Sequence, residues 1–202
     1  MNKRKTIQMI ALIAFILLAA LGKIQLWMAV FGGSLLLSSY FGRFYCGYVC
    51  PINTGMEFID ERAGKKKRKR KPAPELLKSP AVRYGLLALF LGTMVVVFKT
   101  GKKLPVLPAL FAAGIIMTLF YQPELWHRYL CPYGTLLSVF SRFNQKTYMV
   151  HTDDCIKCGR CVRVCPADAF VREDKGDYPR IIRNECLQCG KCVEVCPSDT
   201  IK

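Results

Sequence analysis

The residues most able to do chemistry in this chain are its eleven cysteines, eight of which form two runs of identical spacing. Each run reads C-x2-C-x2-C-x3-C-P, as "CIKCGRCVRVCP" and then, 31 residues later, as "CLQCGKCVEVCP". Three thiolates at this spacing wrap around one face of an iron–sulfur cube, and the fourth lies one turn further along the chain. Zinc also binds C-x2-C pairs, but eight cysteines in two matching runs favour clusters.

The spacing resembles that of bacterial two-cluster ferredoxins, in which the fourth cysteine of each run binds the other cluster. The resemblance implies two [4Fe–4S] clusters with crossed ligand sets. One set is Cys155, Cys158, Cys161 and Cys196, and the other is Cys186, Cys189, Cys192 and Cys165. We expect residues 146–202 to form a small α+β domain of this ferredoxin-like kind, with two short strands between the runs.

Three further cysteines belong to a second motif that occurs twice. The first copy, "CGYVCP", places Cys46 and Cys50 before a proline, whereas the second, "HRYLCP", has His127 at the first position and Cys131 at the second. Histidine can replace cysteine on an iron–sulfur cluster. We therefore hypothesise that these four residues hold a third iron–sulfur cluster. The alternative is that His127 is an interfacial side chain and that the cysteines are redox-active thiols or merely structural.

Four apolar segments flank these motifs and must position them. They span residues 7–21, 24–40, 84–98 and 105–121. At about 15 to 17 residues each, they are at the short end for transmembrane helices. Each Cys-Pro motif follows a pair of such segments, which predicts two parallel hairpin repeats within a four-helix membrane module of residues 1–145.

The charge is segregated along the chain in the same way. All of the net charge of +16 lies in residues 1–151, while residues 152–202 carry nine charges of each sign. Basic residues at 3–5 and at 65–71 flank the apolar segments and are expected on the cytoplasmic side. We interpret the second group as a loop held against anionic lipid head groups rather than as a nucleic-acid site. An even number of crossings then leaves the ferredoxin-like domain in the cytoplasm of a prokaryotic cell.

The stretches "GRFYCGYVCP" and "RYLCPYG", followed by the two ferredoxin runs, resemble the NapH/NosR-type membrane polyferredoxins over nearly the whole chain. The resemblance implies a membrane-bound iron–sulfur subunit that relays single electrons. Its partners would be a membrane redox component, a quinol or a flavoprotein subunit, and a soluble donor or acceptor. The family pattern has two C-x3-C-P copies, and this chain departs from it at His127. We expect any flavin to belong to a separate subunit.

Two other classes of protein remain open. One is an iron–sulfur redox sensor or maturation factor, and the other is an accessory subunit of an ion-translocating redox complex. The sequence shows no nucleophile elbow, phosphate-binding glycine loop or pair of carboxylates, so we expect an electron-transfer component rather than a stand-alone enzyme with catalytic residues. No acidic residue lies within the four apolar segments, so an ion path would need a partner subunit.

Overall fold

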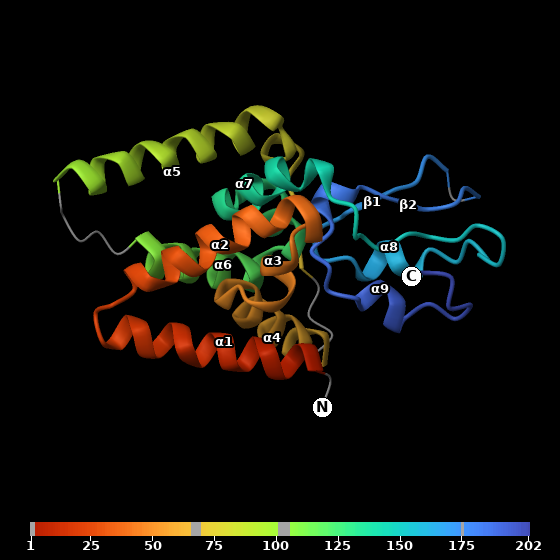
Figure 1. The fold of residues 1–202 in the computed structure, drawn as a ribbon. Coiled ribbons are helices and arrows are strands. Elements are labelled where there is room, and N and C mark those ends of the chain that lie inside the picture. Colours follow the sequence, from red (N-terminus) through yellow and green to blue (C-terminus); the bar gives the residue numbers. More distant parts are fainter. Residues whose placement is uncertain (1–2, 66–69, 101–105, 175) are drawn as a thin grey trace.

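The computed structural model describes residues 3–65, 70–100, 106–174 and 176–202 of the chain. A bundle of helices forms one end of the molecule, and the cysteine-rich C-terminal module forms the other (Figure 1). The helices are α1 (Lys3–Ala20), α2 (Gln25–Phe41), α3 (Phe44–Tyr48), α4 (Pro51–Lys65), α5 (Pro80–Thr100), α6 (Val106–Phe120), α7 (Pro132–Phe140), α8 (Arg160–Val164) and α9 (Lys191–Glu194). The strands are β1 (Phe170–Val171) and β2 (Arg180–Ile181).

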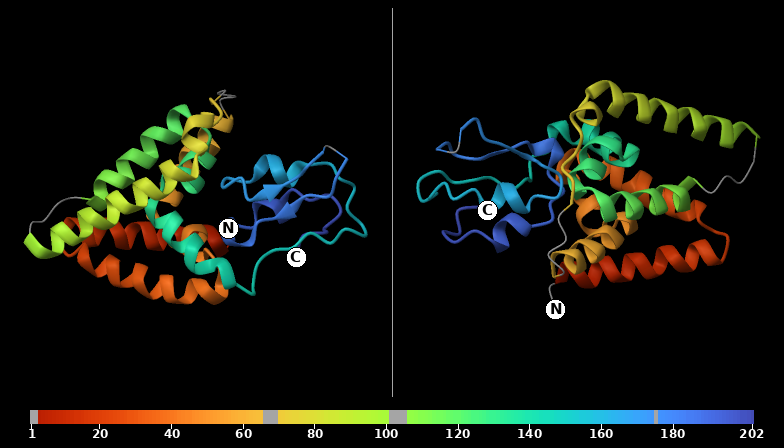
Figure 2. Two further views of the ribbon diagram at one scale, coloured as in Figure 1. Left: turned by 90° about the horizontal axis from the view of Figure 1, so that it is seen from above. Right: turned by 180° about the vertical axis from the view of Figure 1, so that it is seen from behind.

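The apolar segments form two helical hairpins, α1–α2 and α5–α6. In each hairpin the chain runs away from the C-terminal module and then returns to it (Figures 1 and 2). Both Cys-Pro motifs therefore lie at the same end of the bundle. The helix after each motif packs against the other hairpin, because α4 contacts α6 and α7 contacts α2 as well as α5. This exchange holds the two motifs together beside the C-terminal module.

Only one helix within the described ranges is long and apolar enough to cross a membrane, the segment Pro80–Val97 of α5. A 15-residue helix such as α6 is about 22 Å long, which is less than the roughly 30 Å of a bilayer core. The helix α2 has 17 residues, and α1 begins with three charged ones. Our prediction of four transmembrane helices is thus supported for one span only. Most of the predicted basic loop and of the loop before α6, residues 66–69 and 101–105, lies outside the described residues.

The C-terminal module contains the two short strands that the sequence predicted between the cysteine runs. They pair antiparallel, with Phe170 opposite Ile181. A bridge between Val150 and Ile201 joins the start of the module to its end. The turn between the strands includes residue 175, which lies outside the described part of the chain.

One hydrophobic core runs from the helices into the C-terminal module. The largest buried cluster includes Phe31, Trp126 and Tyr133 from the helical end and Ala169 and Leu187 from the C-terminal module. The rings pack edge to face, with the centroids of Phe31 and Tyr133 4.6 Å apart. The shared core fixes the position of the cysteine runs relative to the Cys-Pro motifs.

Candidate iron–sulfur sites

The structure groups the eight cysteines of the two runs into two sets of four, and each set lines its own cavity. The first cavity holds about 330 Å³ of space, its mouth included, and is lined by Cys155, Cys158, Cys161 and Cys196. The second holds about 350 Å³ and is lined by Cys165, Cys186, Cys189 and Cys192. The fourth cysteine of each run thus lies with the other run, in the same crossed sets that the resemblance implied.

The geometry of both sets fits a cluster. The four thiols of each set stand around a cavity. Left-handed φ angles at Lys157, Gly159, Gln188 and Gly190 bend each run around that cavity in the same way. A cube of iron and sulfur needs such a space between its ligands, so the cavities support the predicted ligand sets.

The residues of the two runs differ in their exposure to solvent. Cys158 is exposed, and Ile156, between the first two cysteines of its run, is 65% exposed. The matching residue of the second run, Leu187, is only 2% exposed. We call the set that contains Cys158 the distal site and the set that contains Cys189 the proximal site. The distal site thus contains an exposed cysteine, whereas the helical end of the molecule packs against the proximal run at Leu187.

The proximal site is packed directly against the first Cys-Pro motif. A Cβ atom at Gly47 would overlap the backbone carbonyl oxygen of Leu187, so only glycine allows the two backbones to approach this closely. Leu187 also belongs to the same buried cluster as the three cysteines of the Cys-Pro motifs, and Cys189 borders that cluster. The two kinds of cysteine motif therefore meet across a tight, apolar contact.

A buried carboxylate from the helical end reaches the proximal site. Glu57 of α4 accepts hydrogen bonds from Arg4 at 2.9 and 3.1 Å, and its Oε1 lies 2.8 Å from Nζ of Lys191, between two proximal cysteines. Burial alone would raise the pKa of Glu57. The hydrogen bond from Arg4 and the charge of Lys191 outweigh burial and lower this pKa to about 2. Glu57 is therefore ionised at neutral pH and links α1, α4 and α9.

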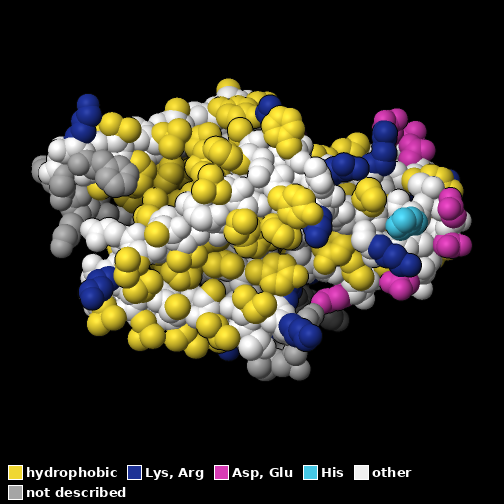
Figure 3. All heavy atoms as spheres, in the orientation of Figure 1, with side chains coloured by type: hydrophobic (Ala, Val, Ile, Leu, Met, Phe, Trp, Pro, Cys, Tyr) yellow, Lys and Arg dark blue, Asp and Glu magenta, His cyan; other side chains and the backbone are white. Residues whose placement is uncertain are grey.

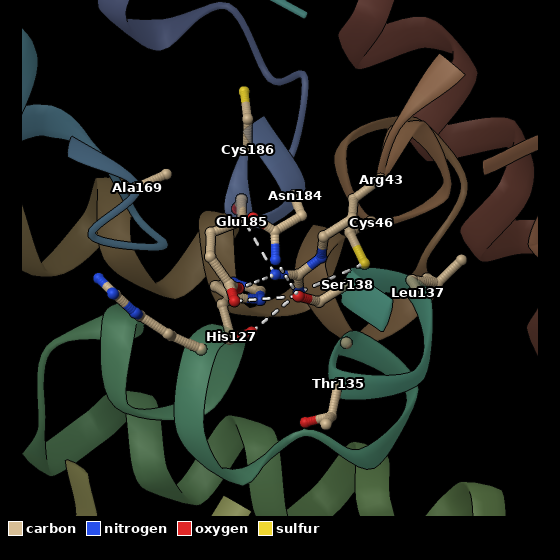
Figure 4. Close-up of polar contacts among 12 residues, drawn as sticks. Arg43, Cys46, His127, Thr135, Leu137, Ser138, Ala169, Asn184, Glu185 and Cys186 are labelled. Carbon is tan, nitrogen blue, oxygen red and sulfur yellow. Dashed lines mark hydrogen bonds and ion pairs between the residues drawn. The ribbon is translucent and has the colours of Figure 1, made fainter. Parts of the chain in front are cut away.

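A second buried carboxylate, from the C-terminal module, binds arginines of the helical end. Glu185, immediately before Cys186, receives hydrogen bonds from Arg43 at 2.9 Å, from Arg83 at 2.6 and 3.2 Å, and from Ser138 at 2.9 Å (Figure 4). Burial raises the pKa of Glu185, but the two guanidinium groups lower it below its usual value. The side chain of Cys186 points away from this network, and its thiol lines the proximal cavity (Figure 4).

Arg43 is the residue that connects the three cysteine motifs. Its side chain is fully buried and pairs with Glu185 of the second ferredoxin run. It also donates a hydrogen bond of 2.9 Å to the backbone carbonyl of His127, and Nη2 lies 4.0 Å from Sγ of Cys46 (Figure 4). One guanidinium therefore contacts both Cys-Pro motifs and the loop that leads into the proximal site.

The imidazole of His127 is buried at the second Cys-Pro motif. His127 is 5% exposed and lines a separate small cavity with Asn53 and Glu57. Burial, and then the charge of Arg43, lowers the pKa of the imidazole to about 3, so the ring is neutral. The guanidinium of Arg43 lies beside Cys46. The role of His127 as a ligand with the three cysteines stays a prediction.

The three cysteines of the Cys-Pro motifs are buried in one cluster, and both motifs have the same local backbone. The N–H of Cys50 donates to the carbonyl of Tyr45 at 2.8 Å, and the N–H of Cys131 donates to that of Trp126 at 2.9 Å, five residues back in each case. The second of these wide turns is a π-helix. Such turns are frequent at functional sites. The following prolines then begin α4 and α7, where a missing N–H costs nothing.

Sequence reasoning missed the ion pairs that join the two modules. Arg43 and Glu57 stand alone near the first Cys-Pro motif, Arg83 lies far from every motif, and no pattern in the sequence marks them. Glu185 did carry a signal, because it precedes the first cysteine of its run just as Asp154 precedes that of the other run.

Comparison with known families separates the same parts of the chain. Residues 147–197 match the model of a 4Fe-4S dicluster domain. Residues 24–71 and 104–149 each match the model of a 4Fe-4S binding domain. The second model thus occurs twice, once around each Cys-Pro motif.

Relatives among known proteins are distant. The chain is 28% identical over 144 residues to the uncharacterized protein MJ0749 of Methanocaldococcus jannaschii, covering 69% of this chain and 58% of that protein. It is 29% identical over 157 residues to the protein named "Putative electron transport protein YccM" of Escherichia coli, covering 66% and 44%. It is 27% identical over 154 residues to the methylamine utilization ferredoxin-type protein MauN of Paracoccus denitrificans, covering 66% and 53%.

The chain spans about half the length of these curated relatives. No solved structure matches it significantly. The matched domain models and the paired cysteine cavities lead to one conclusion about its chemistry. The chain carries 4Fe-4S ferredoxin-type domains, one with two cysteine runs in the C-terminal module and two more around the Cys-Pro motifs of the helical end.

Proposed function

We propose that the chain is a membrane-bound electron-transfer subunit that relays single electrons through [4Fe–4S] clusters in the distal and proximal sites. Such clusters, when bound, supply the one-electron carriers. The observation that carries the proposal is the unequal setting of the two sites. The distal site is open to soluble partners through Cys158, whereas the proximal site is packed on Gly47 of the first Cys-Pro motif. A relay must reach a soluble partner from one site and a membrane partner from the other.

The names of two relatives support this proposal, since one is called an electron transport protein and the other a ferredoxin-type protein. The protein's own residues position and tune the clusters. In the proximal site the backbone N–H of Ala169 lies 3.3 Å from Sγ of Cys165, and that of Gln188 lies 3.5 Å from Sγ of Cys186. Hydrogen bonds to ligand sulfurs stabilise the reduced, more negative cluster and so raise its reduction potential.

The surface of the helical end supports a place in the membrane. Large apolar side chains cover it, whereas acidic side chains gather on the C-terminal module (Figure 3). Exposed examples are Ile10 on α1, Leu36 on α2 and Leu89 on α5. A contiguous apolar surface of this size marks contact with lipid or with another protein. We place the helical end in the membrane of a prokaryotic cell, with the C-terminal module on the cytoplasmic side.

The three buried thiols of the Cys-Pro motifs lie on the helical side of the proximal site. In the proposed relay they are nearest to the membrane partner, a quinol or a flavoprotein subunit. A third iron–sulfur cluster at this place would rest on Cys46, Cys50 and Cys131, with His127 as the hypothesised fourth ligand.

Electron flux through lipid vesicles tests the relay. The full-length chain with loaded clusters is placed in vesicles that contain a short-chain quinone, and a soluble one-electron reductant is added outside. We expect quinone reduction at least tenfold above that of protein-free vesicles. Cys158→Ser in the distal site and Cys189→Ser in the proximal site should each return the rate to background. Reduction that stops after one turnover per chain would contradict a relay and favour a redox sensor.

A further inference from the structure

The two cysteine runs share more than their ligands when they are aligned at their 31-residue offset. Asp154 aligns with Glu185, each immediately before the first cysteine. Ile156 aligns with Leu187, and Arg160 aligns with Lys191. The backbones also match, because left-handed φ angles occur at Lys157 and Gln188, at Gly159 and Gly190, and at Asp168 and Asp199. Each run therefore presents an acidic, an apolar and a basic residue from the same loop conformation.

In the proximal run, all three of these residues bind the helical end of the molecule. The carboxylate of Glu185 pairs with Arg43 at 2.9 Å and with Arg83 at 2.6 Å. The backbone of Leu187 lies against Gly47. The ammonium group of Lys191 pairs with Glu57 at 2.8 Å. The proximal run thus docks through an acid that meets guanidinium groups, an apolar residue that meets a glycine, and a base that meets a carboxylate.

In the distal run, the equivalent three residues are all exposed. Within the part of the chain that the structure describes, neither Asp154 nor Arg160 has an ion-pair partner, and Ile156 is 65% exposed to solvent. They flank Cys158, the exposed cysteine of the distal site, in the sequence. We name Asp154, Ile156 and Arg160 the distal triad. It repeats the docking residues of the proximal run at an exposed surface.

We propose that the distal triad is the docking surface for the soluble redox partner of the distal site. The partner is a protein that presents, beside its own electron carrier, a basic side chain to Asp154, a small residue to Ile156 and a carboxylate to Arg160. This inference rests on the proposed electron relay and specifies its soluble partner. Opposite charges at both edges of an apolar contact fix the register of a complex and favour the correct orientation.

The positions of the charged residues distinguish specific docking at this surface from attraction by net charge alone. A partner attracted only by net charge would respond equally to any acidic residue near Cys158. Asp153 is adjacent, exposed and also acidic, yet its counterpart in the proximal run is Asn184, whose side chain bonds Ser138 rather than an ion. The repeat therefore predicts that Asp154 is a docking residue and that Asp153 is not.

The experiment uses the full-length chain in membranes of its source cells, with a photo-crosslinking residue in place of Ile156. We expect one main adduct, with a protein that carries a redox cofactor. Asp154→Arg and Arg160→Glu, each introduced singly, should lower the yield of that adduct at least tenfold. The matched control Asp153→Arg changes the charge by the same amount one residue away, and it should leave most of the adduct.

The captured protein then serves as the probe in a rate measurement. The chain with native Ile156 is mixed with this protein after the stronger reductant of the two has been reduced and the other oxidised, and electron transfer is followed by the change in cluster absorbance. Each triad reversal should lower the second-order rate at least tenfold, while oxidation by ferricyanide, which needs no docking, stays unchanged. Reversing the basic residue of the probe that lies nearest the crosslink should restore the rate with Asp154→Arg.

Three results would overturn the inference. They are an adduct that both reversals leave intact, an adduct that Asp153→Arg removes as completely as Asp154→Arg, and the absence of any adduct at Ile156 in a chain that still reduces quinone in vesicles. Failure of the vesicle assay itself would count against the electron relay. The two proposals therefore fail in different experiments.

Discussion

Replacing Cys165 with serine is expected to abolish the proximal cluster, to leave the distal cluster in place, and to remove about half of the iron bound by the C-terminal module. Cys165 follows the first run in sequence, yet it lines the cavity of the second run. Serine is a poor ligand for the iron of such a cluster, and the three remaining thiolates share one buried face. The measurement is iron and acid-labile sulfide per chain after anaerobic purification.

Double variants decide which cysteines share a cluster. Cys165→Ser combined with Cys189→Ser should bind as much iron as either single variant, because both changes affect one site. Cys165→Ser combined with Cys158→Ser should lose the iron of both sites. Grouping by sequence run instead of by cavity predicts the opposite pattern, so these two variants separate the two assignments. Dependence of this kind between residues is what a double-mutant cycle detects.

Replacing Arg43 with glutamine is expected to loosen the contact between the helical end and the proximal site. The change leaves the buried carboxylate of Glu185 with one guanidinium instead of two and removes the donor to the carbonyl of His127. Breaking a buried pair by removing one partner costs about 3 kcal/mol or more. We expect a lower midpoint of thermal unfolding, read from cluster absorbance, and faster proteolytic release of the C-terminal module.

Matched variants show whether the effect belongs to this interface. Arg180 pairs with Glu173 on the surface, where the two side chains are 75% and 74% exposed, so Arg180→Gln should cost less than about 1 kcal/mol. Gly47→Val should act like Arg43→Gln, because its side chain meets the carbonyl of Leu187. An Arg43→Gln chain as stable as the Arg180→Gln chain would contradict the role of Arg43 at the interface.

The parts of the structure that follow from local patterns could be predicted from the sequence. The spacing of the cysteines, through the ferredoxin resemblance, implied the two crossed sets that the cavities display. Apolar runs predicted the two hairpins, since a continuous apolar segment of this length has few other ways to satisfy its backbone. The same runs did not reveal how many helices cross a membrane. The helices α1, α2 and α6 are each too short, or too charged at one end, to meet the length and hydrophobicity of a membrane span.

The contacts that position the candidate sites depend on residues far apart in the chain. Arg43 and Glu185 are 142 residues apart and meet only because α7, the cysteine run and the first Cys-Pro motif pack together. For the same reason the sequence could not show that Arg43 donates a hydrogen bond to the carbonyl of His127 and lies beside Cys46.

We expect one cluster site to be open to solvent through Cys158 and the other to be shielded by the helical end. The most direct test is the power saturation of the electron paramagnetic resonance signal of the reduced full-length chain, with and without a water-soluble dysprosium chelate. Cys165→Ser retains only the distal cluster, and Cys196→Ser retains only the proximal one. We predict strong relaxation enhancement by the chelate in Cys165→Ser and little in Cys196→Ser. Equal enhancement in both variants, or no [4Fe–4S] signal in either, would contradict the proposed difference between the two sites.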